Sequence, residues 1–158
     1  MSAPSPSLAS RFQLDPAADG LELARRWAEA RFAGGFAERL RAWPVAVERG
    51  RMTIRCDLDP GHANFVGLVH GGVTAALVDI AGGGVAMTLL KPGEHLLSTD
   101  LTLRFLNAAP IDADHLIAEA RAAYADQRKV VAEVTVGLPD GRVVAHGTAA
   151  VSIRRRET

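Results

Sequence analysis

The clearest pattern in the chain is an alternation with a period of two between residues 96 and 105. Two sets of side chains alternate there, apolar Leu97, Leu101, Leu103 and Phe105 and polar Ser98, Asp100, Thr102 and Arg104. Such alternation predicts a β-strand that buries the apolar set against a core and exposes the polar set.

Further strands are predicted on both sides of this one. Three extended segments follow it, beginning at His115, Lys129 and Arg142, and the short turn 139–141 joins the last two. Short connections imply antiparallel neighbours. An earlier extended segment starts at Val45 and has a turn near its glycine at position 50. The sum is an antiparallel sheet of five or six strands.

A long apolar segment separates the early strands from the late ones. Residues 72–87 predict a helix of about 17 residues, which ends before Pro92-Gly93. Its one charged residue is Asp79. Because a helix that is apolar or small on most sides must be surrounded, the sheet is expected to curl around it. The predicted fold class is α+β, with one central helix wrapped by the sheet.

The N-terminal part has a different character. Residues 1–18 are rich in Ser, Pro and Ala and are expected to form a flexible arm. Asp19 and Glu22 resemble a capping box that opens a helical extension over residues 19–44, interrupted at Gly34-Gly35. The remaining residues, 45–158, are expected to form one domain, since 158 residues are too few for two well-cored ones.

Composition excludes several classes of function. The chain is 48% hydrophobic and 23% charged with a formal net charge of zero, which argues against nucleic acid as a partner. Its single cysteine, Cys56, allows no intrachain disulfide and no cysteine-based metal cluster. The first residues lack the apolar core of a signal peptide, and no run approaches the roughly 18 apolar residues of a membrane span. We expect a cytoplasmic protein without a membrane partner.

Asp79 raises the first question of chemistry, because a buried carboxylate is costly unless it is paired or hydrogen-bonded. Only small residues share its face of the helix: Gly72, Ala75, Ala76, Gly82, Gly83 and Ala86. Two interpretations remain open here. Either the helix packs tightly on the sheet with Asp79 bonded to a hydroxyl, or the small residues allow close approach by a ligand or a second backbone.

The start of the helix offers a second feature, besides Asp79, that could take part in a reaction. Gly71 and Gly72 present bare backbone N–H groups at the positive end of the helix dipole, which favours a polarised carbonyl or an oxyanion. Gly71 and Asp79 are eight residues apart, about 12 Å along one helix at a rise of about 1.5 Å per residue. One chain cannot bring both to one carbon atom. A two-fold dimer with antiparallel helices brings them together in two equal sites.

A family resemblance joins these residues. The run Asn64-x-x-Gly67-x-x-His70-Gly71-Gly72, followed by Leu77-Val78-Asp79 and by Ser98-Thr99-Asp100, resembles the hotdog-fold acyl-CoA thioesterases of the phenylacetate-pathway and thioesterase-superfamily-member-2 type. The likeness covers about Val45 to Ile153. It implies the hotdog fold, a homodimer that pairs again into a tetramer, and hydrolysis of an acyl-CoA substrate with neither metal nor other cofactor.

The resemblance also implies roles. Asn64 and the backbone N–H of Gly71 polarise the thioester carbonyl, Asp79 of the partner acts as general base or nucleophile, Ser98 helps to place the water or the acid, and His70 orients Asn64. Substrate-binding residues are expected at Gly72, Ala75, Gly82, Gly83 and Thr99. Some relatives carry a histidine in the last strand, where this chain has Ala149, and His146 nearby should face the opposite way.

The sequence leaves open an alternative function and the role of the basic run near the end of the chain. A non-catalytic module that binds acyl-CoA in the same groove is the alternative function, and an enoyl-thioester hydratase is disfavoured because no convincing Asp/His pattern for it is present. The basic run 154–156 fits either contact with CoA phosphates or simple solvation. The lone His62, His95 and His115 are expected to be solvated and not metal ligands.

Overall fold

The computed structural model describes residues 15–31 and 34–155. Six strands form one antiparallel sheet in the order β1-β2-β4-β5-β6-β3. Their bounds are β1 Ala42–Glu48, β2 Arg51–Asp57, β3 Glu94–Phe105, β4 His115–Ala125, β5 Lys129–Gly137 and β6 Val143–Arg155. The helices are α1 Gly20–Ala30, α2 Gly35–Arg39 and α3 Gly71–Met87, with a short 3-10 turn η1 at Pro60–His62.

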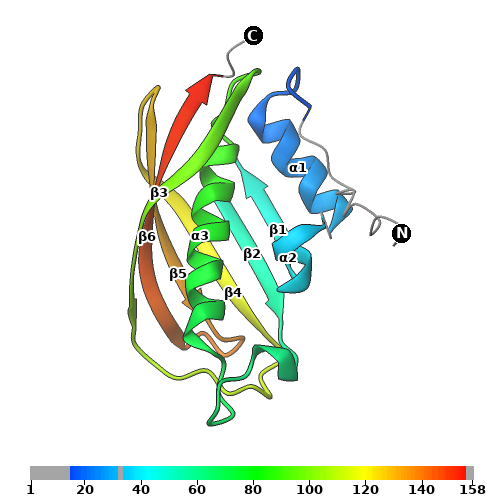
Figure 1. The fold of residues 1–158 in the computed structure, drawn as a ribbon, viewed down its shortest axis with the longest axis vertical. Helices are drawn as coiled ribbons and strands as arrows, with labels where there is room; N and C mark the ends of the chain where they lie inside the picture. Colours follow the sequence, from blue (N-terminus) through cyan, green and yellow to red (C-terminus); the bar gives the residue numbers. More distant parts are fainter. Residues whose placement is uncertain (1–14, 32–33, 156–158) are drawn as a thin grey trace, which may run out of the picture.

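The long helix α3 lies in the concave side of the curled sheet (Figure 1). Its side chains Leu77, Val78 and Val85 have no exposed surface, which places the core between this helix and the sheet. The predicted α+β hotdog fold, with a sheet wrapped around one central helix, is confirmed. The helix begins one residue earlier than predicted, at Gly71.

Strand β3 departs from the predicted alternation. A β-bulge interrupts its pairing with β6 between Ser98 and Asp100. In a regular strand Ser98 and Phe105 would face opposite sides, because an odd number of positions separates them. The bulge shifts the phase, so that Ser98 bonds to α3 and Phe105 also lies against the start of α3.

Of the four apolar residues expected to be buried on this strand, Leu103 packs against the core, and the expectation is wrong for the other three. Leu97 is 60% exposed, and Leu101 and Phe105 are exposed as well. The reason is topological, because β3 lies at an edge of the sheet, where no further strand of this chain's sheet covers it. Those side chains are exposed on the surface of the single chain, where another molecule can contact them.

The N-terminal helices pack against β1, which forms the edge of the sheet opposite β3. Asp19 caps α1 by accepting hydrogen bonds from the backbone N–H groups of Leu21 and Glu22, and Trp27 of α1 is buried. The N–H of Gly20 donates to the carbonyl of Leu90, which ties α1 to the segment that follows α3. Most of the arm expected over residues 1–18 lies outside the described residues.

Candidate functional site

A cleft of about 320 Å³ opens beside the N-terminal end of α3. It brings together two of the predicted site residues, Asn64 and Gly71, with an apolar wall that includes Leu68, Val69, Phe105 and Leu106. The ring of Phe105 lies so close to Gly71 that a Cβ atom added there would be 3.1 Å from its Cζ atom. The chain therefore approaches the helix start closely enough to favour glycine at this position.

Asn64 is held in one orientation by its own loop. Its Oδ1 atom accepts hydrogen bonds from the backbone N–H groups of Val66 and Leu68, both at 3.0 Å. Because the oxygen is committed to these donors, the amide nitrogen must take the other position. That nitrogen has no hydrogen-bond partner within the described part of the chain. Asn64 thus has two N–H groups to offer.

The first turn of α3 leaves one further donor. His70 is the N-cap: its Nδ1 atom accepts from the N–H of Gly72 at 2.8 Å, and its carbonyl accepts from Val73 at 2.9 Å. The N–H of Gly71 has no acceptor among residues 15–31 and 34–155. We call Asn64 and Gly71 the donor half-site, since both carry unused donors and line one cleft. Such a pair suits the oxygen of a carbonyl or of a tetrahedral oxyanion.

Two predicted residues at this end have other partners. The N–H of Gly72 is already taken by His70, so this glycine contributes to capping. His70 forms no hydrogen bond with Asn64 among the described residues. The histidine that holds the preceding loop is instead His62, whose backbone carbonyl accepts from the N–H of His70 at 2.8 Å.

His62 was expected to be solvated, and that expectation is wrong. Its side chain is 5% exposed. The Nε2 atom lies 3.0 Å from the carbonyl oxygen of Leu40, and Nδ1 accepts from the N–H of Asp59. His62 therefore anchors the turn that leads into Asn64, and its signal in the sequence is the Asp59–His62 capping box, which sequence reasoning missed.

The acid lies in the middle of the helix. Ser98 of β3 donates a hydrogen bond from its hydroxyl to Oδ1 of Asp79 at 2.6 Å. We call these two residues the acid half-site. Thr99, at the bulge, instead donates to the carbonyl of Ala150 at 3.2 Å. A hydroxyl that donates to one carboxylate oxygen leaves the other oxygen able to accept a proton from water or to attack an acyl carbon.

One chain does not join the two half-sites. Gly71 and Asp79 belong to the same unbroken helix, so eight residues separate them by about 12 Å at a rise of about 1.5 Å per residue. Groups that act on one atom must lie within about 3 Å of it. Within one chain the donor half-site and the acid half-site therefore lie too far apart to act on the same atom.

The glycines near Asp79 serve two different purposes. A Cβ on Gly82 would be 2.4 Å from the Cβ of Ala149, and one on Gly84 would be 2.2 Å from Sδ of Met52. These two glycines let the helix pack closely on the sheet. Gly83 meets nothing closer than 4.0 Å, and Ala75 is also partly exposed. Gly83 and Ala75 are thus two of the predicted small residues beside Asp79 that a neighbour can still reach.

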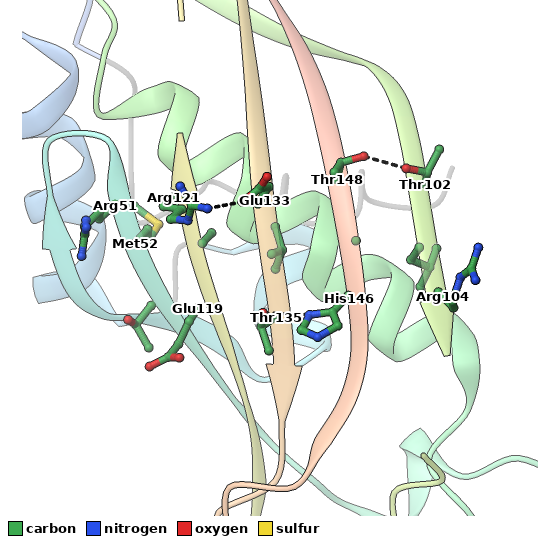
Figure 2. A pocket seen from close by; sticks show the side chains of 15 residues that line it. Arg51, Met52, Thr102, Arg104, Glu119, Arg121, Glu133, Thr135, His146 and Thr148 are labelled. Carbon is green, nitrogen blue, oxygen red and sulfur yellow. Dashed lines mark hydrogen bonds and ion pairs between the residues drawn. The ribbon is translucent and has the colours of Figure 1, made fainter. Parts of the chain in front are cut away.

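The last strand offers no histidine to the site. Ala149 is fully buried under Gly82, so a larger side chain has no room there. His146 lies on the face of the sheet opposite α3, where Thr135 Oγ1 is 3.0 Å from its Nδ1 atom (Figure 2). That face carries a hollow of about 820 Å³, lined by charged and hydroxyl side chains such as Arg121, Glu133 and Thr148. None of the predicted site residues lines it.

Across residues 15–31 and 34–155, no group of three or more His, Cys, Asp or Glu is placed to hold a metal ion. Within the same ranges, no helix has the length and apolar character needed to cross a membrane.

Comparison with known proteins agrees with the fold. The profile of the Thioesterase superfamily matches residues 66–145. A search of curated protein sequences found no significant match.

Solved structures show the same architecture. A thioesterase family protein from Silicibacter pomeroyi has a TM-score of 0.76 at 22% identity, with 86% of this chain and 99% of that chain covered. The Escherichia coli PaaI protein from the phenylacetic acid degradation operon has a TM-score of 0.72 at 18% identity, covering 85% and 94%. A hypothetical thioesterase from Streptococcus pneumoniae, solved with coenzyme A, has a TM-score of 0.66 at 20% identity, covering 74% and 91%.

Proposed function

The chain belongs to the thioesterase superfamily, and from this premise we propose that it hydrolyses acyl-CoA thioesters to the free acid and CoA at a site shared by two protomers. The observation that carries the proposal is the separation of the donor half-site from the acid half-site on one helix. We assign the chain to the type represented by the phenylacetate-pathway enzymes, on the motif from Asn64 to Asp79 and on the likeness to PaaI.

The dimer is supported by the surface around the half-sites. Strand β3 is 12 residues long and lies at an edge of the sheet, with one row of backbone groups unpaired in the monomer. Large apolar side chains are exposed on this strand and on the loops at its end, namely Phe65, Val66, Leu97, Leu101, Phe105 and Leu106. Exposed apolar surface of this kind marks an interface.

The geometry of the pair follows from the helix. Two copies of α3 placed side by side and antiparallel bring Gly71 of one protomer opposite Asp79 of the other, and two-fold symmetry makes two equal sites. Gly83 and Ala75 leave room for that approach. We further propose that two such dimers pair into a tetramer.

The proposed mechanism uses the free groups of each half-site. The N–H groups of Gly71 and Asn64 donate to the thioester carbonyl and to the oxyanion that forms from it. Asp79 of the opposite protomer either takes a proton from the attacking water or attacks the acyl carbon itself, and Ser98 holds it in place. In either route the C–S bond breaks, the thiolate of CoA leaves, and water supplies the hydroxyl of the acid. A thiolate leaves readily near neutral pH, so no leaving-group acid is needed.

The testing experiment is a thiol-release assay over aryl- and fatty acyl-CoAs. The chain's own thiol does not interfere, because Cys56 is buried and burial raises its pKa to about 12. Release of free CoA from at least one acyl class by the wild-type protein supports the proposal. Tight binding of CoA thioesters without release of thiol, across the whole panel, contradicts it and favours a binding module.

A further inference from the structure

Thr74, three residues after Gly71 on α3, is a buried polar residue that neither half-site uses. It is 2% exposed and lines the cleft beside the start of the helix. Its Oγ1 atom forms no hydrogen bond with any described residue. Because buried hydroxyl groups are normally paired, the cleft is where this hydroxyl can find a partner.

A second buried threonine shows what a satisfied hydroxyl looks like in this fold. Thr88 follows the last residue of α3 and has no exposed surface. Its Oγ1 atom donates to the carbonyl of Val85 at 2.7 Å and accepts from the N–H of Gly50 at 2.8 Å. At position 74 a valine would fill the same space without burying an unpaired hydroxyl, which costs free energy. The threonine there indicates a partner that comes from outside the chain.

The cleft is graded from a buried floor to an exposed rim. Three of the residues that line it are buried and apolar, namely Val69, Ala109 and Val144. We call these three residues and Thr74 the floor of the cleft. Phe105 and Leu106 are exposed and form its rim. An apolar floor with one hydroxyl suits a mostly apolar ligand that carries one polar group, since such a group fixes the orientation of the ligand.

Thr74 lies close to the donor half-site. Positions three apart on a helix are neighbours, with Cβ atoms about 5–6 Å apart, and helical side chains lean toward the N-terminus. The side chain of Thr74 therefore leans toward Gly71. In an acyl chain, four bonds of about 1.2–1.5 Å each separate the carbonyl oxygen from an oxygen on the third carbon. A thioester carbonyl bound at Gly71 thus places a third-carbon oxygen within reach of Thr74.

The chemistry of the floor decides which side of the thioester enters the cleft. The CoA side of the ligand carries charged phosphates, which are costly to bury against apolar side chains without a counter-charge. None of the described residues that line the cleft is charged. The acyl group is the side that matches the floor.

We propose that Thr74 selects acyl groups that carry an oxygen on their third carbon, through a hydrogen bond at the floor of the cleft. The inference rests on the proposed function for the identity of the ligand. Because a hydroxyl both donates and accepts, it can bind an oxo or a hydroxy substituent. Thr74 is a specificity-determining residue in this assignment, and the reacting atoms stay with Gly71, Asn64 and Asp79.

The test compares two substrates that differ in that oxygen. The ratio of kcat/KM for 3-oxobutyryl-CoA to kcat/KM for butyryl-CoA is measured for the wild type, for Thr74→Val and for Thr74→Ser. In Thr74→Val the ratio should fall about tenfold, because one hydrogen bond to the substituent is lost while the shape of the side chain is kept. Thr74→Ser keeps the hydroxyl and should retain most of the wild-type ratio.

The matched control is Thr53→Val. Thr53 is a partly buried threonine of β2 that lines the hollow on the opposite face of the sheet. Its replacement should leave the ratio unchanged. An equal fall in kcat for both substrates in Thr74→Val would make Thr74 a third donor to the oxyanion and overturn the assignment. An unchanged ratio in Thr74→Val overturns it as well.

Calorimetry separates this proposal from the proposed function. Binding of the two thioesters is compared in Asp79→Asn and in Asp79→Asn/Thr74→Val, so that hydrolysis does not consume them. The 3-oxobutyryl thioester should bind more tightly than the butyryl thioester, and the second substitution should remove that advantage. If it does so and the wild type releases no thiol, the proposed function fails and the recognition by Thr74 remains. If the wild type hydrolyses both thioesters and binding shows no such advantage, the function stands and the role of Thr74 is overturned.

Discussion

The donor half-site and the acid half-site share one helix, yet they are built from different parts of the chain. At the start of α3, the available hydrogen-bond donors are the backbone N–H of Gly71 and the side-chain amide of Asn64. Two backbone N–H groups of its own loop hold that amide in place. In the middle of α3, the group that we propose to react is the single side chain of Asp79, bonded to Ser98 on a neighbouring strand.

The difference shows how each half depends on its surroundings. The donor half-site depends on loop and helix-start geometry, so one lost side chain removes part of its donors and leaves the Gly71 N–H in place. The acid half-site holds one ionisable group, Asp79, and none of the described residues lining the cleft of the donor half-site carries a carboxylate. Loss of Asp79 should therefore cost more than loss of Asn64.

The largest effect is expected from Asp79→Asn. The substitution keeps the size of the side chain and removes its proton-accepting and nucleophilic capacity, so kcat should fall by about 10³-fold. Thiol release and thermal unfolding are measured together. Glu48→Gln is the matched control, since this exposed carboxylate lies at the end of β1 and has no ion pair in the described residues. Near-normal turnover in Asp79→Asn would remove this residue from the mechanism.

A smaller loss is expected from Asn64→Ala. One of two donors to the oxyanion disappears while Gly71 remains, so kcat should fall by about 10²-fold with a modest change in KM. The control is Asn107→Ala, because Asn107 lines the same cleft but already donates its amide to the carbonyl of Val143 at 2.8 Å. If both variants lose the same fraction of activity, the amide of Asn64 does not stabilise the oxyanion in the way proposed.

Mixing these two inactive variants tests whether the half-sites meet across a dimer. In a dimer of one Asp79→Asn chain and one Asn64→Ala chain, one site combines the two intact halves and the other combines the two damaged ones. After unfolding and refolding together in equal amounts, the mixture should recover about a quarter of the wild-type activity, since half of the dimers are mixed. Activity that stays at the average of the two variants would place both halves of the centre in one chain.

The smallest effect is expected from Ser98→Ala. The hydroxyl positions Asp79 and does not itself react, so we expect kcat to fall about tenfold, the cost of one hydrogen bond to a charged group. Ser152→Ala on β6 serves as the control for loss of a partly buried serine hydroxyl. A Ser98→Ala variant as inactive as Asp79→Asn would mean that the serine takes part in the chemistry.

Much of this molecule could be predicted from local patterns. The alternation of apolar and polar residues with a period of two predicted β3 to β6, and the run of small and apolar residues predicted α3. The candidate residues Asn64 and Gly71 do line one cleft, and Ser98 does bond to Asp79. These successes share a cause, because helix and strand periodicity and the spacing within a motif are properties of neighbouring residues.

The errors arose where distant segments meet. The bulge at Thr99 depends on the pairing of β3 with β6, two strands that are far apart in the chain, and that pairing turned Ser98 toward the helix and Leu97 toward solvent. The burial of His62 depends on a carbonyl 22 residues away, at Leu40. No local pattern reports such contacts.

The sequence by itself determined the kinds of element, their order and the chemistry available on the central helix. Only the tertiary structure placed Phe105 of β3 against Gly71 at the start of α3, where the two close off one wall of the cleft. It also decided which glycines the fold needs, because Gly82 and Gly84 lie against Ala149 and Met52 on different strands. The physical reason is that close packing and hydrogen-bond satisfaction are settled between segments brought together by the fold.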